Sequence, residues 1–269
     1  MHQWHWQTWG DAAYLTCSLL ADWPHGFFTR AFAPKTPEVL VQALSPTAAA
    51  YRGQQVHGNQ VLAPSEIPTA MAAVPGAVAT LPERPPADGM LTDAANQSVW
   101  VCSADCSPVL IAHCKTGQVA AVHAGWRGTA QRIVPAAAAR LLESGSVEDL
   151  RVAIGPAIAG EVYQVSSQVG AEVGATVAAG ILSHAEATSA ELLLSALQAL
   201  ENPPILSDAE PGRVRLDVRR INLLQLQQMG LQDKQIAIAP HCTYQDAERF
   251  FSYRRTRQKQ VQWSGIVSR

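Results

Sequence analysis

The chain has 269 residues, enough to bury a substantial core in one or two domains without disulfides or a structural metal. Its 20 basic and 22 acidic residues leave a formal charge of −2, which provides no long-range attraction for a phosphate backbone, so we expect no nucleic-acid partner. Five cysteines that cannot all pair, an N-terminus without a basic region and no apolar run of about 18 residues predict a cytoplasmic protein with no membrane partner.

The first half of the chain contains the more strongly patterned strands. An aromatic N-terminal strand is expected around Trp4, Trp6 and Trp9, and residues 62–90 are rich in alanine and proline, which predicts an irregular connection. Short apolar strands are expected at 98–106, 108–112 and 118–123. A helix is expected to begin after Gly128 and to cover residues 129–143.

The second half mixes helices and strands. A strand is expected at 150–156, two helices within 169–200 with a break near Gly180 and His184, a loop at 203–212, a helix at 218–229 ended by Gly230, and a strand at 235–240. This order lacks the strict alternation of a doubly wound fold, so we predict an α+β protein. No heptad pattern or apolar surface stripe indicates an oligomer, and we expect a monomer.

Five basic residues lie close together near the C-terminus, with no acidic residue between them. They are Arg249, Arg254, Arg255, Arg257 and Lys259. One interpretation is a solvated edge strand whose charges discourage aggregation. The other is an anion pocket, because guanidinium groups bind phosphate or carboxylate through two parallel hydrogen bonds. The pattern favours neither.

Three separate segments carry residues that could bind a metal. His57 is followed by a glycine, Cys106 follows Asp105 and precedes Ser107-Pro108, and His123 lies where a predicted strand enters a Gly-flanked turn. Singly, each is more typical of a structural role. Together, two histidines and one cysteine form a three-ligand set for Zn²⁺, which in catalytic sites keeps a fourth position for water or substrate.

A competing interpretation uses the same residues without a metal. Cys106 would be a thiolate nucleophile with His123 as its base, as in cysteine hydrolases. Cys102, four residues earlier, would lie on the same side of a regular strand as Cys106 and would be a core residue. Near the basic segment, Thr243 could contribute a hydroxyl to a substrate pocket.

Several motifs in this chain are similar to those of one family. The most specific are Ala104-Asp105-Cys106 and the run from His123 to Gly128, and the others are Gln55-Val56-His57-Gly58, Ala87-Asp88, Gly155-Pro156, Tyr163-Gln164-Val165, Leu216-Asp217, Asn222 to Gln225, Cys242-Thr243 and Phe250 to Arg255. In this order, over about residues 54–255, they resemble the bacterial laccase-domain proteins. These were long described as polyphenol oxidases and later reinterpreted as zinc-dependent purine nucleoside phosphorylases with adenosine deaminase activity, and some are called peptidoglycan editing factors.

The resemblance has direct implications for the fold and the metal. It implies one catalytic domain over residues 1–269, built as an α/β/β/α sandwich with mixed sheets, and it places the metal ligands on His57, Cys106 and His123. It implies Zn²⁺, with Cu²⁺ as an alternative that would confer a side activity of oxidation. The eight histidines include no His-x-His pair, so a multicopper laccase is excluded.

The resemblance also implies substrates and roles. The substrates would be phosphate and purine nucleosides, namely adenosine, inosine, guanosine and methylthioadenosine, with deamination of adenosine in addition. We expect Asp105 to move a proton and Arg127, with Arg254 and Arg255, to hold phosphate. A third hypothesis is a non-enzymatic cell-wall editing protein. The chain departs from the family after Arg255, where it has Thr-Arg-Gln-Lys-Gln in place of the common Asp-Gly and Thr-Gly-Arg.

Overall fold

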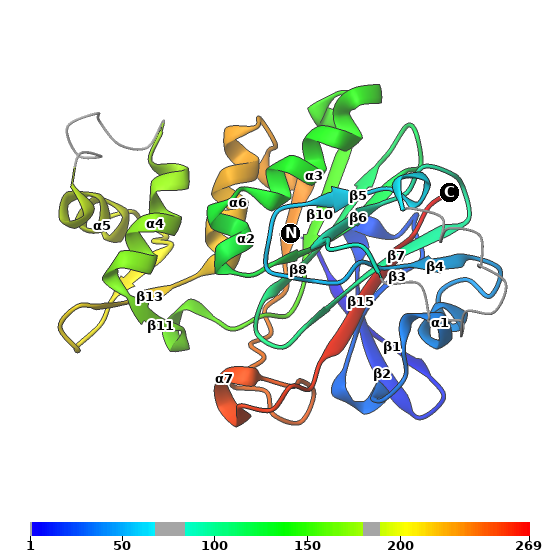
Figure 1. Ribbon diagram of the computed structural model, residues 1–269, viewed down its shortest axis with the longest axis horizontal. Coiled ribbons are helices and arrows are strands. Elements are labelled where there is room, and N and C mark those ends of the chain that lie inside the picture. Colours follow the sequence, from blue (N-terminus) through cyan, green and yellow to red (C-terminus); the bar gives the residue numbers. More distant parts are fainter. Residues whose placement is uncertain (1, 68–83, 180–188) are drawn as a thin grey trace, which may run out of the picture.

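Two six-stranded sheets packed face to face form the centre of the molecule. The computed structural model describes residues 2–67, 84–179 and 189–269 (Figure 1). In spatial order, the first sheet contains β1 (Trp4–Trp9), β2 (Ala12–Cys17), β3 (His25–Phe28), β15 (Gln262–Val267), β7 (Gln97–Ser103) and β4 (Ala49–Tyr51). The second contains β14 (Ile236–Ile238), β10 (Leu150–Ile154), β8 (Ser107–His113), β9 (Val119–Ala124), β6 (Gly89–Leu91) and β5 (Val61–Leu62). Both sheets are mixed, because each combines antiparallel and parallel pairs.

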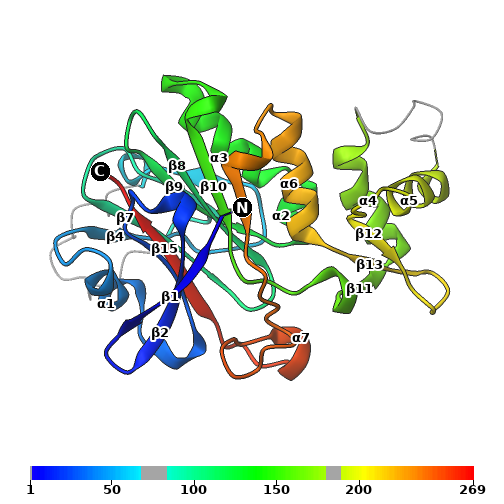
Figure 2. The same ribbon diagram turned by 180° about the vertical axis from the view of Figure 1, so that it is seen from behind.

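Helices cover the outer faces of this pair of sheets. The described helices are α1 (Pro37–Leu40), α2 (Trp126–Ala130), α3 (Ile133–Leu141), α4 (Ser167–Ala178), α5 (Ala190–Gln198), α6 (Val218–Gln228) and α7 (Tyr253–Thr256). The helices α3 and α6 lie against the second sheet, and α1 lies beside the first sheet on the opposite side (Figures 1 and 2). The predicted α+β class and its α/β/β/α layering are therefore confirmed.

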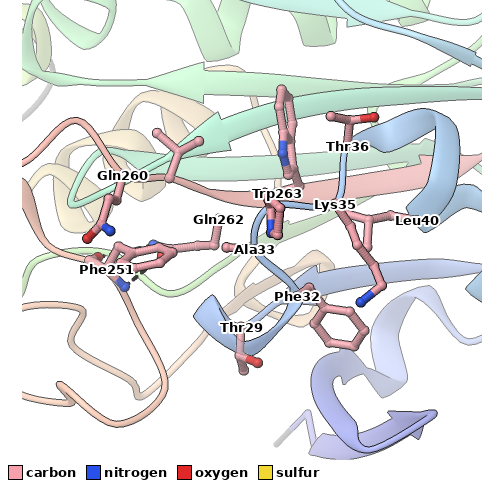
Figure 3. Close-up of a pocket in the computed structure, with 12 residues that line it drawn as sticks. Thr29, Phe32, Ala33, Lys35, Thr36, Leu40, Phe251, Gln260, Gln262 and Trp263 are labelled. Carbon is pink, nitrogen blue, oxygen red and sulfur yellow. Dashed lines mark hydrogen bonds between the residues drawn. The ribbon is translucent and has the colours of Figure 1, made fainter.

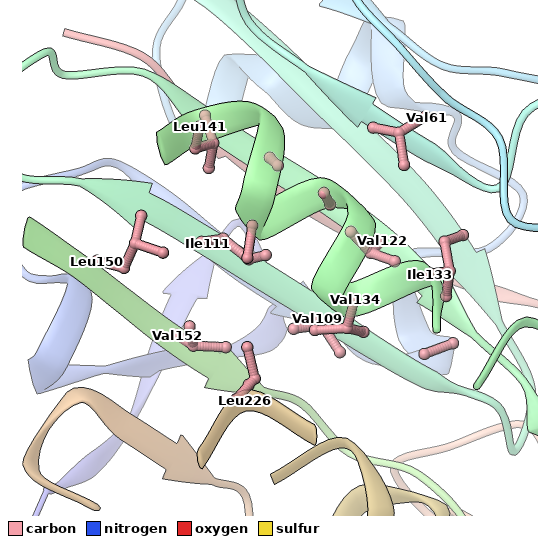
Figure 4. Close-up of a cluster of buried hydrophobic side chains, with 14 of the residues drawn as sticks. Val61, Val109, Ile111, Val122, Ile133, Val134, Leu141, Leu150, Val152 and Leu226 are labelled. Carbon is pink, nitrogen blue, oxygen red and sulfur yellow. The ribbon is translucent and has the colours of Figure 1, made fainter. Parts of the chain in front are cut away.

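Burial on both faces explains why β8 and β9 consist of continuous apolar runs. One face of β9 packs on the first sheet through Val119 and Ala121, while the other packs under α3 through Ala120 and Val122 (Figure 4). Burying a Val or Leu side chain contributes about 1.5–3 kcal/mol each, so these two strands provide a rigid support for the segments at their ends.

A smaller unit of sheet and helix lies to one side of the main sandwich. It contains the antiparallel strands β11 (Gln164–Ser166), β13 (Arg213–Leu216) and β12 (Ile205–Ser207), which pack with α4 and α5. The two predicted helices within 169–200 are confirmed, although their expected break falls outside the described residues. The loop predicted at 203–212 is wrong in part, because Ile205 is buried in β12 and pairs with Leu216.

Three other predictions need correction. The helix expected at 129–143 is two helices, because Pro135 has no N–H to donate and its ring would clash with the carbonyl of Gln131 in a continuous helix. The chain turns between them at Arg132, whose φ is 57°. The strand expected at 98–106 ends at Ser103, so Cys102 and Cys106 do not share a strand.

The basic segment is not an edge strand. Residues 249–259 contain the short helix α7 and a loop, and β15 begins only at Gln262. The remaining predicted strands at 150–156 and 235–240 correspond to β10 and β14, and the aromatic strand corresponds to β1. Across the residues that the structure describes, no helix is long and apolar enough to cross a membrane.

Candidate metal centre

The structure brings His57, Cys106 and His123 together. One potential ligand atom from each residue lies within 4.8 Å of the other two. The rings of His57 and His123 are 5.0 Å apart between centroids and nearly perpendicular, at 80°. The distances are those of a cluster that a single ion can draw together, and two imidazole nitrogens with one sulfur suit a transition metal. We refer to these three residues as the metal cluster.

Strand pairing explains how two of the three residues meet. In the antiparallel pair β8 and β9, Pro108 is opposite His123 and Ser107 is opposite Ala124. Cys106 directly precedes β8, so its side chain lies beside His123 at the same end of the sheet. Asp105, with a φ of 99°, makes the tight turn that separates Cys106 from β7.

The buried carboxylate of Asp88 holds the segment that carries His57 and orients the ring of His123. Asp88 is fully buried just before β6, and its oxygens accept hydrogen bonds from the backbone N–H groups of Val56, His57 and Gly58 at 2.8–2.9 Å. Its Oδ1 also lies 2.8 Å from Nδ1 of His123. A histidine bound at Nδ1 by a carboxylate presents Nε2 to a metal.

Sequence reasoning missed this role of Asp88. The residue was noted only as part of a matching Ala87-Asp88 motif, and one signal was available, an aspartate inside an otherwise apolar segment before Gly89. A charged residue that is almost never buried without partners indicates a hydrogen-bonding duty when it falls in such a segment.

Electrostatics favour the ionised thiol. Burial opposes the thiolate of Cys106, yet the imidazoles of His123 and His57 outweigh it and lower the pKa of the thiol to about 6. Burial likewise opposes the charged form of His123, while the Cys106 thiolate and Asp88 together raise its pKa to about 9. The thiolate form that a metal requires is therefore accessible at neutral pH.

Close packing around the sulfur restricts the residue at position 125. A Cβ added at Gly125 would lie 2.8 Å from Sγ of Cys106 and 3.5 Å from Cδ2 of His57. No side chain fits there unless the sulfur moves. The glycine that directly precedes α2 is thus required by the close approach of the metal cluster, since its φ of −73° is open to any residue.

The metal cluster lies in a cleft of about 560 Å³. The residues lining the cleft are Gln55, His57, Cys102, Ser103, Ala104, Asp105, Cys106, His123, Trp126, Arg127, Tyr163, Tyr253, Arg254, Arg257, Gln258, Lys259, Gln260 and Val261. They combine aromatic rings, four cationic side chains and one carboxylate. A volume of roughly 300–1,000 Å³ with a few convergent polar groups is typical of small-molecule sites.

Some of the other predicted site residues line the cleft, and others lie behind its wall. Arg127 and Arg254 line the cleft, with their guanidinium groups over the rings of Trp126 at 4.5 Å and Tyr163 at 4.8 Å. Arg254 also donates a hydrogen bond to the carbonyl of Gln164.

Arg255 and Thr243 do not line the cleft. The guanidinium of Arg255 donates hydrogen bonds to the backbone carbonyls of Thr243, Tyr244 and Phe250, each at 2.7 Å. Thr243 is fully buried, and its hydroxyl donates to Oδ1 of Asp105 at 2.7 Å. Both residues support the cleft wall from behind.

Asp105 lines the cleft with a largely satisfied carboxylate. Its Oδ1 accepts from Thr243, and its Oδ2 accepts from the backbone N–H of Arg254 at 2.7 Å. These two hydrogen bonds fix the orientation of the carboxylate. Tyr163, a second residue missed from sequence, has a pKa raised to about 12 by burial and by the nearby Cys106 thiolate, so its phenol remains a hydrogen-bond donor.

A second pocket lies beside the cleft, on the other side of the segment that leads into β15. It has a volume of about 380 Å³ and shares Gln260 and Val261 with the cleft. Phe32, Phe251 and Trp263 surround it (Figure 3). Its lining includes no histidine, cysteine or carboxylate, so the chemistry of this part of the molecule belongs to the cleft.

The fold and the cleft together define a class of protein. It is an α+β sandwich of two mixed sheets that carries a His-Cys-His cluster suited to a transition metal in a cationic, aromatic cleft. A family model described as Multi-copper polyphenol oxidoreductase laccase matches residues 35–268. The chain belongs to this family, which confirms the resemblance inferred from the motifs.

Individual relatives agree with this assignment. A Synechocystis protein named Purine nucleoside phosphorylase slr1573 is 53% identical over 268 residues, which cover 98% of this chain and 97% of the relative. Purine nucleoside phosphorylase YlmD of Geobacillus stearothermophilus is 30% identical over 76% of this chain and 66% of its own length. The crystal structure of that organism's YlmD covers 98% of both chains with a TM-score of 0.74 and 26% identity. A Bacillus licheniformis protein, YfiH, at 20% identity and a TM-score of 0.71 over 98% of this chain and 99% of its own, shows the fold alone.

Proposed function

We propose that this protein is a zinc-dependent purine nucleoside phosphorylase whose metal ligands are His57, Cys106 and His123. The observation that carries the proposal is the metal cluster at the base of a cleft lined by cationic and aromatic side chains. Two relatives named purine nucleoside phosphorylase, one of them 53% identical, support the choice of reaction.

The donor set fits a transition metal. Asp88 directs Nε2 of His123 toward the site, the thiol of Cys106 ionises readily, and the cleft leaves one side of the metal cluster open to a ligand. Zinc, or copper as an alternative, would supply Lewis-acid polarisation of a substrate atom. Copper bound in place of zinc would account for weak oxidase activity as a side reaction.

For phosphorolysis, the residues of the cleft bind and orient two reactants. An oxygen of phosphate attacks C1′ of the nucleoside, the bond from C1′ to the base breaks, and the electron pair leaves with the base. Arg127 and Arg254 are the cations on the α2 and α7 sides of the cleft that can neutralise the phosphate. The phenol of Tyr163 is placed to donate a hydrogen bond to the bound nucleoside.

Deamination of adenosine is a second activity that the cleft can support. The cleft lining includes a single carboxylate, Asp105, and the hydroxyl of Thr243 and the N–H of Arg254 hold it in place. An ionised carboxylate in this position can accept a proton from an attacking water and return it to the departing amine. We propose adenosine, inosine, guanosine and methylthioadenosine as substrates.

One observation favours a different class of enzyme. The lowered pKa of Cys106 and the raised pKa of His123 describe a thiolate and imidazolium pair of the kind found in cysteine hydrolases. An amide hydrolase built on this pair would keep its activity in a chelator and lose it to iodoacetamide. The phosphorylase would lose its activity to the chelator and regain it with zinc.

The test combines metal analysis with two assays. Purified protein should contain about one zinc per chain, as expected for one His₂Cys site, and should release base from inosine or adenosine only when phosphate is present. Cys106→Ala should lose the zinc and the turnover together. Full turnover in metal-free Cys106→Ala would overturn the proposal, and an absence of phosphate-dependent base release from every nucleoside would favour a non-enzymatic editing protein.

The cellular setting of this activity follows from the same features. We propose that the enzyme acts in the cytoplasm, because all five cysteines are free thiols, and that it is a monomer, because the sequence has no heptad pattern or apolar surface stripe. Free thiols persist in a reducing compartment.

A further inference from the structure

The cationic wall of the cleft is larger than one inorganic phosphate requires. Arg127 and Arg254 lie beside the metal cluster, and Arg257 and Lys259 extend the wall along the loop that follows α7. The opposing charges in the lining are the thiolate of Cys106, which belongs to the metal cluster, and the carboxylate of Asp105, which already accepts hydrogen bonds from Thr243 and from backbone. The wall therefore has a surplus of positive charge for an anionic ligand.

The side chains of Arg257 and Lys259 have no hydrogen-bonding or charged partners among the residues that the structure describes. Among the described residues, neither side chain makes a salt bridge or a side-chain hydrogen bond, and Arg257 only lies over the ring of Tyr253 at 5.8 Å. By contrast, Arg249 of the same basic segment pairs with Asp246 at 3.0 Å. Both side chains are exposed and line the cleft, so they are free to contact a ligand from outside the chain.

The backbone at Arg257 gives a second, independent indication. Its φ is 60° and its ψ is 14°, a left-handed conformation at the end of α7 that glycine adopts without cost. A long side chain here opposes the local backbone preference, and its contact with the fold is the distant one with the ring of Tyr253. An arginine held at such a position inside a binding cleft indicates a role in binding.

We propose that the cleft takes purine nucleosides that carry their own phosphate, with Arg257 and Lys259 holding that phosphate. This inference rests on the proposed phosphorylase function and names its substrate class, a purine nucleoside monophosphate. Arg127 and Arg254 then remain for inorganic phosphate. A cleft of about 560 Å³ with Trp126 and Tyr253 in its walls has room and aromatic surface for the base.

The reaction on this substrate balances without another reactant. An oxygen of inorganic phosphate bonds to C1′, the bond from C1′ to the purine nitrogen breaks, and the base takes up the proton that the phosphate releases. The products are the free base and a ribose with phosphate on both C1 and C5. Arg257 and Lys259 touch only the phosphate that does not react.

The test compares two probes, adenosine and adenosine 5′-monophosphate, on the zinc-loaded protein by calorimetry and by phosphate-dependent base release. We expect the monophosphate to bind about tenfold more tightly than adenosine at low salt, since its phosphate gains charge-assisted hydrogen bonds. Arg257→Gly combined with Lys259→Gln should remove this preference while the affinity for adenosine and the KM for inorganic phosphate stay unchanged. Arg257→Gly alone should leave the melting temperature unchanged or higher.

A matched variant controls for loss of charge as such. Arg249→Gln removes one positive charge from the same segment outside the cleft lining and should keep the preference for the monophosphate. Equal binding of the two probes, or a preference that survives in the double variant, would overturn the inference. So would a rise in the KM for inorganic phosphate in the double variant, because the two cations would then hold the attacking phosphate.

The two proposals fail in different ways. Turnover of adenosine without tighter binding of the monophosphate overturns the inference and leaves the phosphorylase function in place. Arg257-dependent binding of the monophosphate without release of base from either probe supports the second phosphate site and overturns the phosphorylase function. If neither probe binds, both proposals are wrong.

Discussion

Asp88→Asn removes one negative charge from the centre of the site and nearly preserves the shape of the side chain. The carboxylate accepts four N–H groups, with Oδ2 bound by Val56 and Gly58 and Oδ1 bound by His57 and by Nδ1 of His123. In either orientation of the asparagine amide, its NH₂ group faces two of these donors. The variant therefore loses two hydrogen bonds, and the NH₂ group of the asparagine faces two N–H groups that have no acceptor there.

The expected loss of stability follows from the number of hydrogen bonds that the variant loses. A hydrogen bond to a charged group contributes about 1.5–3 kcal/mol, so losing two lowers the free energy of unfolding by about 3–6 kcal/mol. The variant also frees the ring of His123 and lowers its pKa, because Asp88 is one of the groups that raise it. Removing such an orienting carboxylate reduces metal affinity by about 10–100-fold.

The assay is a competition between the protein and a chelator for zinc, with urea unfolding of the metal-free protein measured in parallel. Because the expected loss is a large share of a typical stability of about 5–15 kcal/mol, the titration is made at a temperature where circular dichroism shows the native fold. Asp149→Asn is the control, since that carboxylate binds Ser146 far from the cleft. It should destabilise the protein and leave zinc affinity unchanged, and unchanged zinc affinity in folded Asp88→Asn would refute the reasoning.

Three further outcomes test the cleft. Alkylation of Cys106 by iodoacetamide in the metal-free protein should rise with pH with a midpoint near 6, because the thiolate is the reactive form and its pKa is lowered to about 6. Gly125→Ala should weaken zinc binding by about tenfold or more, since the new Cβ would lie 2.8 Å from Sγ of Cys106. Arg127→Gln should raise the KM for phosphate by about tenfold at unchanged melting temperature, whereas Arg255→Gln should lower the unfolding free energy by about 2–4 kcal/mol through its lost carbonyl contacts.

Each of these outcomes has a control within the chain. Cys102, whose pKa is raised to about 11 by burial, should stay unreactive at neutral pH, and an alkylation midpoint near the ordinary thiol value of about 8.5 would contradict the first expectation. Gly58→Ala places its Cβ no closer than 3.6 Å to a neighbour and should keep zinc affinity. Retention of phosphate affinity in Arg127→Gln, with loss in stable Arg255→Gln, would reverse the roles of the two arginines.

Much of the fold was predictable because its signals are local. The continuous apolar runs of β8 and β9 predicted strands, and the periodicity of α4 and α6 predicted helices. One error arose where a nonlocal contact decides the outcome, and another where a single proline interrupts an otherwise helical pattern. The strand β12 forms because Ile205 pairs with a partner eleven positions away, Leu216, and the break before α3 reflects the clash that Pro135 would make with Gln131.

For the metal cluster, the residue types were predictable from the sequence, whereas their proximity was not. His57, Cys106 and His123 were selected from the sequence because two histidines and one cysteine together form a three-ligand set and because each lies in a motif of the family. Their proximity depends on the register of β8 with β9 and on Asp88, which holds the segment around His57 through three backbone N–H groups. Neither the register of β8 with β9 nor the contacts of Asp88 can be predicted from a local sequence pattern.

The sequence by itself determined the small net charge, the α+β class and the family, and it indicated the three candidate metal ligands, since each follows from residue type or from motifs within a few neighbouring positions. Only the tertiary structure divided the basic segment, with Arg254, Arg257 and Lys259 in the cleft and Arg255 bound to backbone carbonyls behind it. Arg254 and Arg255 carry the same charge and differ in role because consecutive residues of α7 point in different directions, one into the cleft and the other toward the backbone carbonyls behind it.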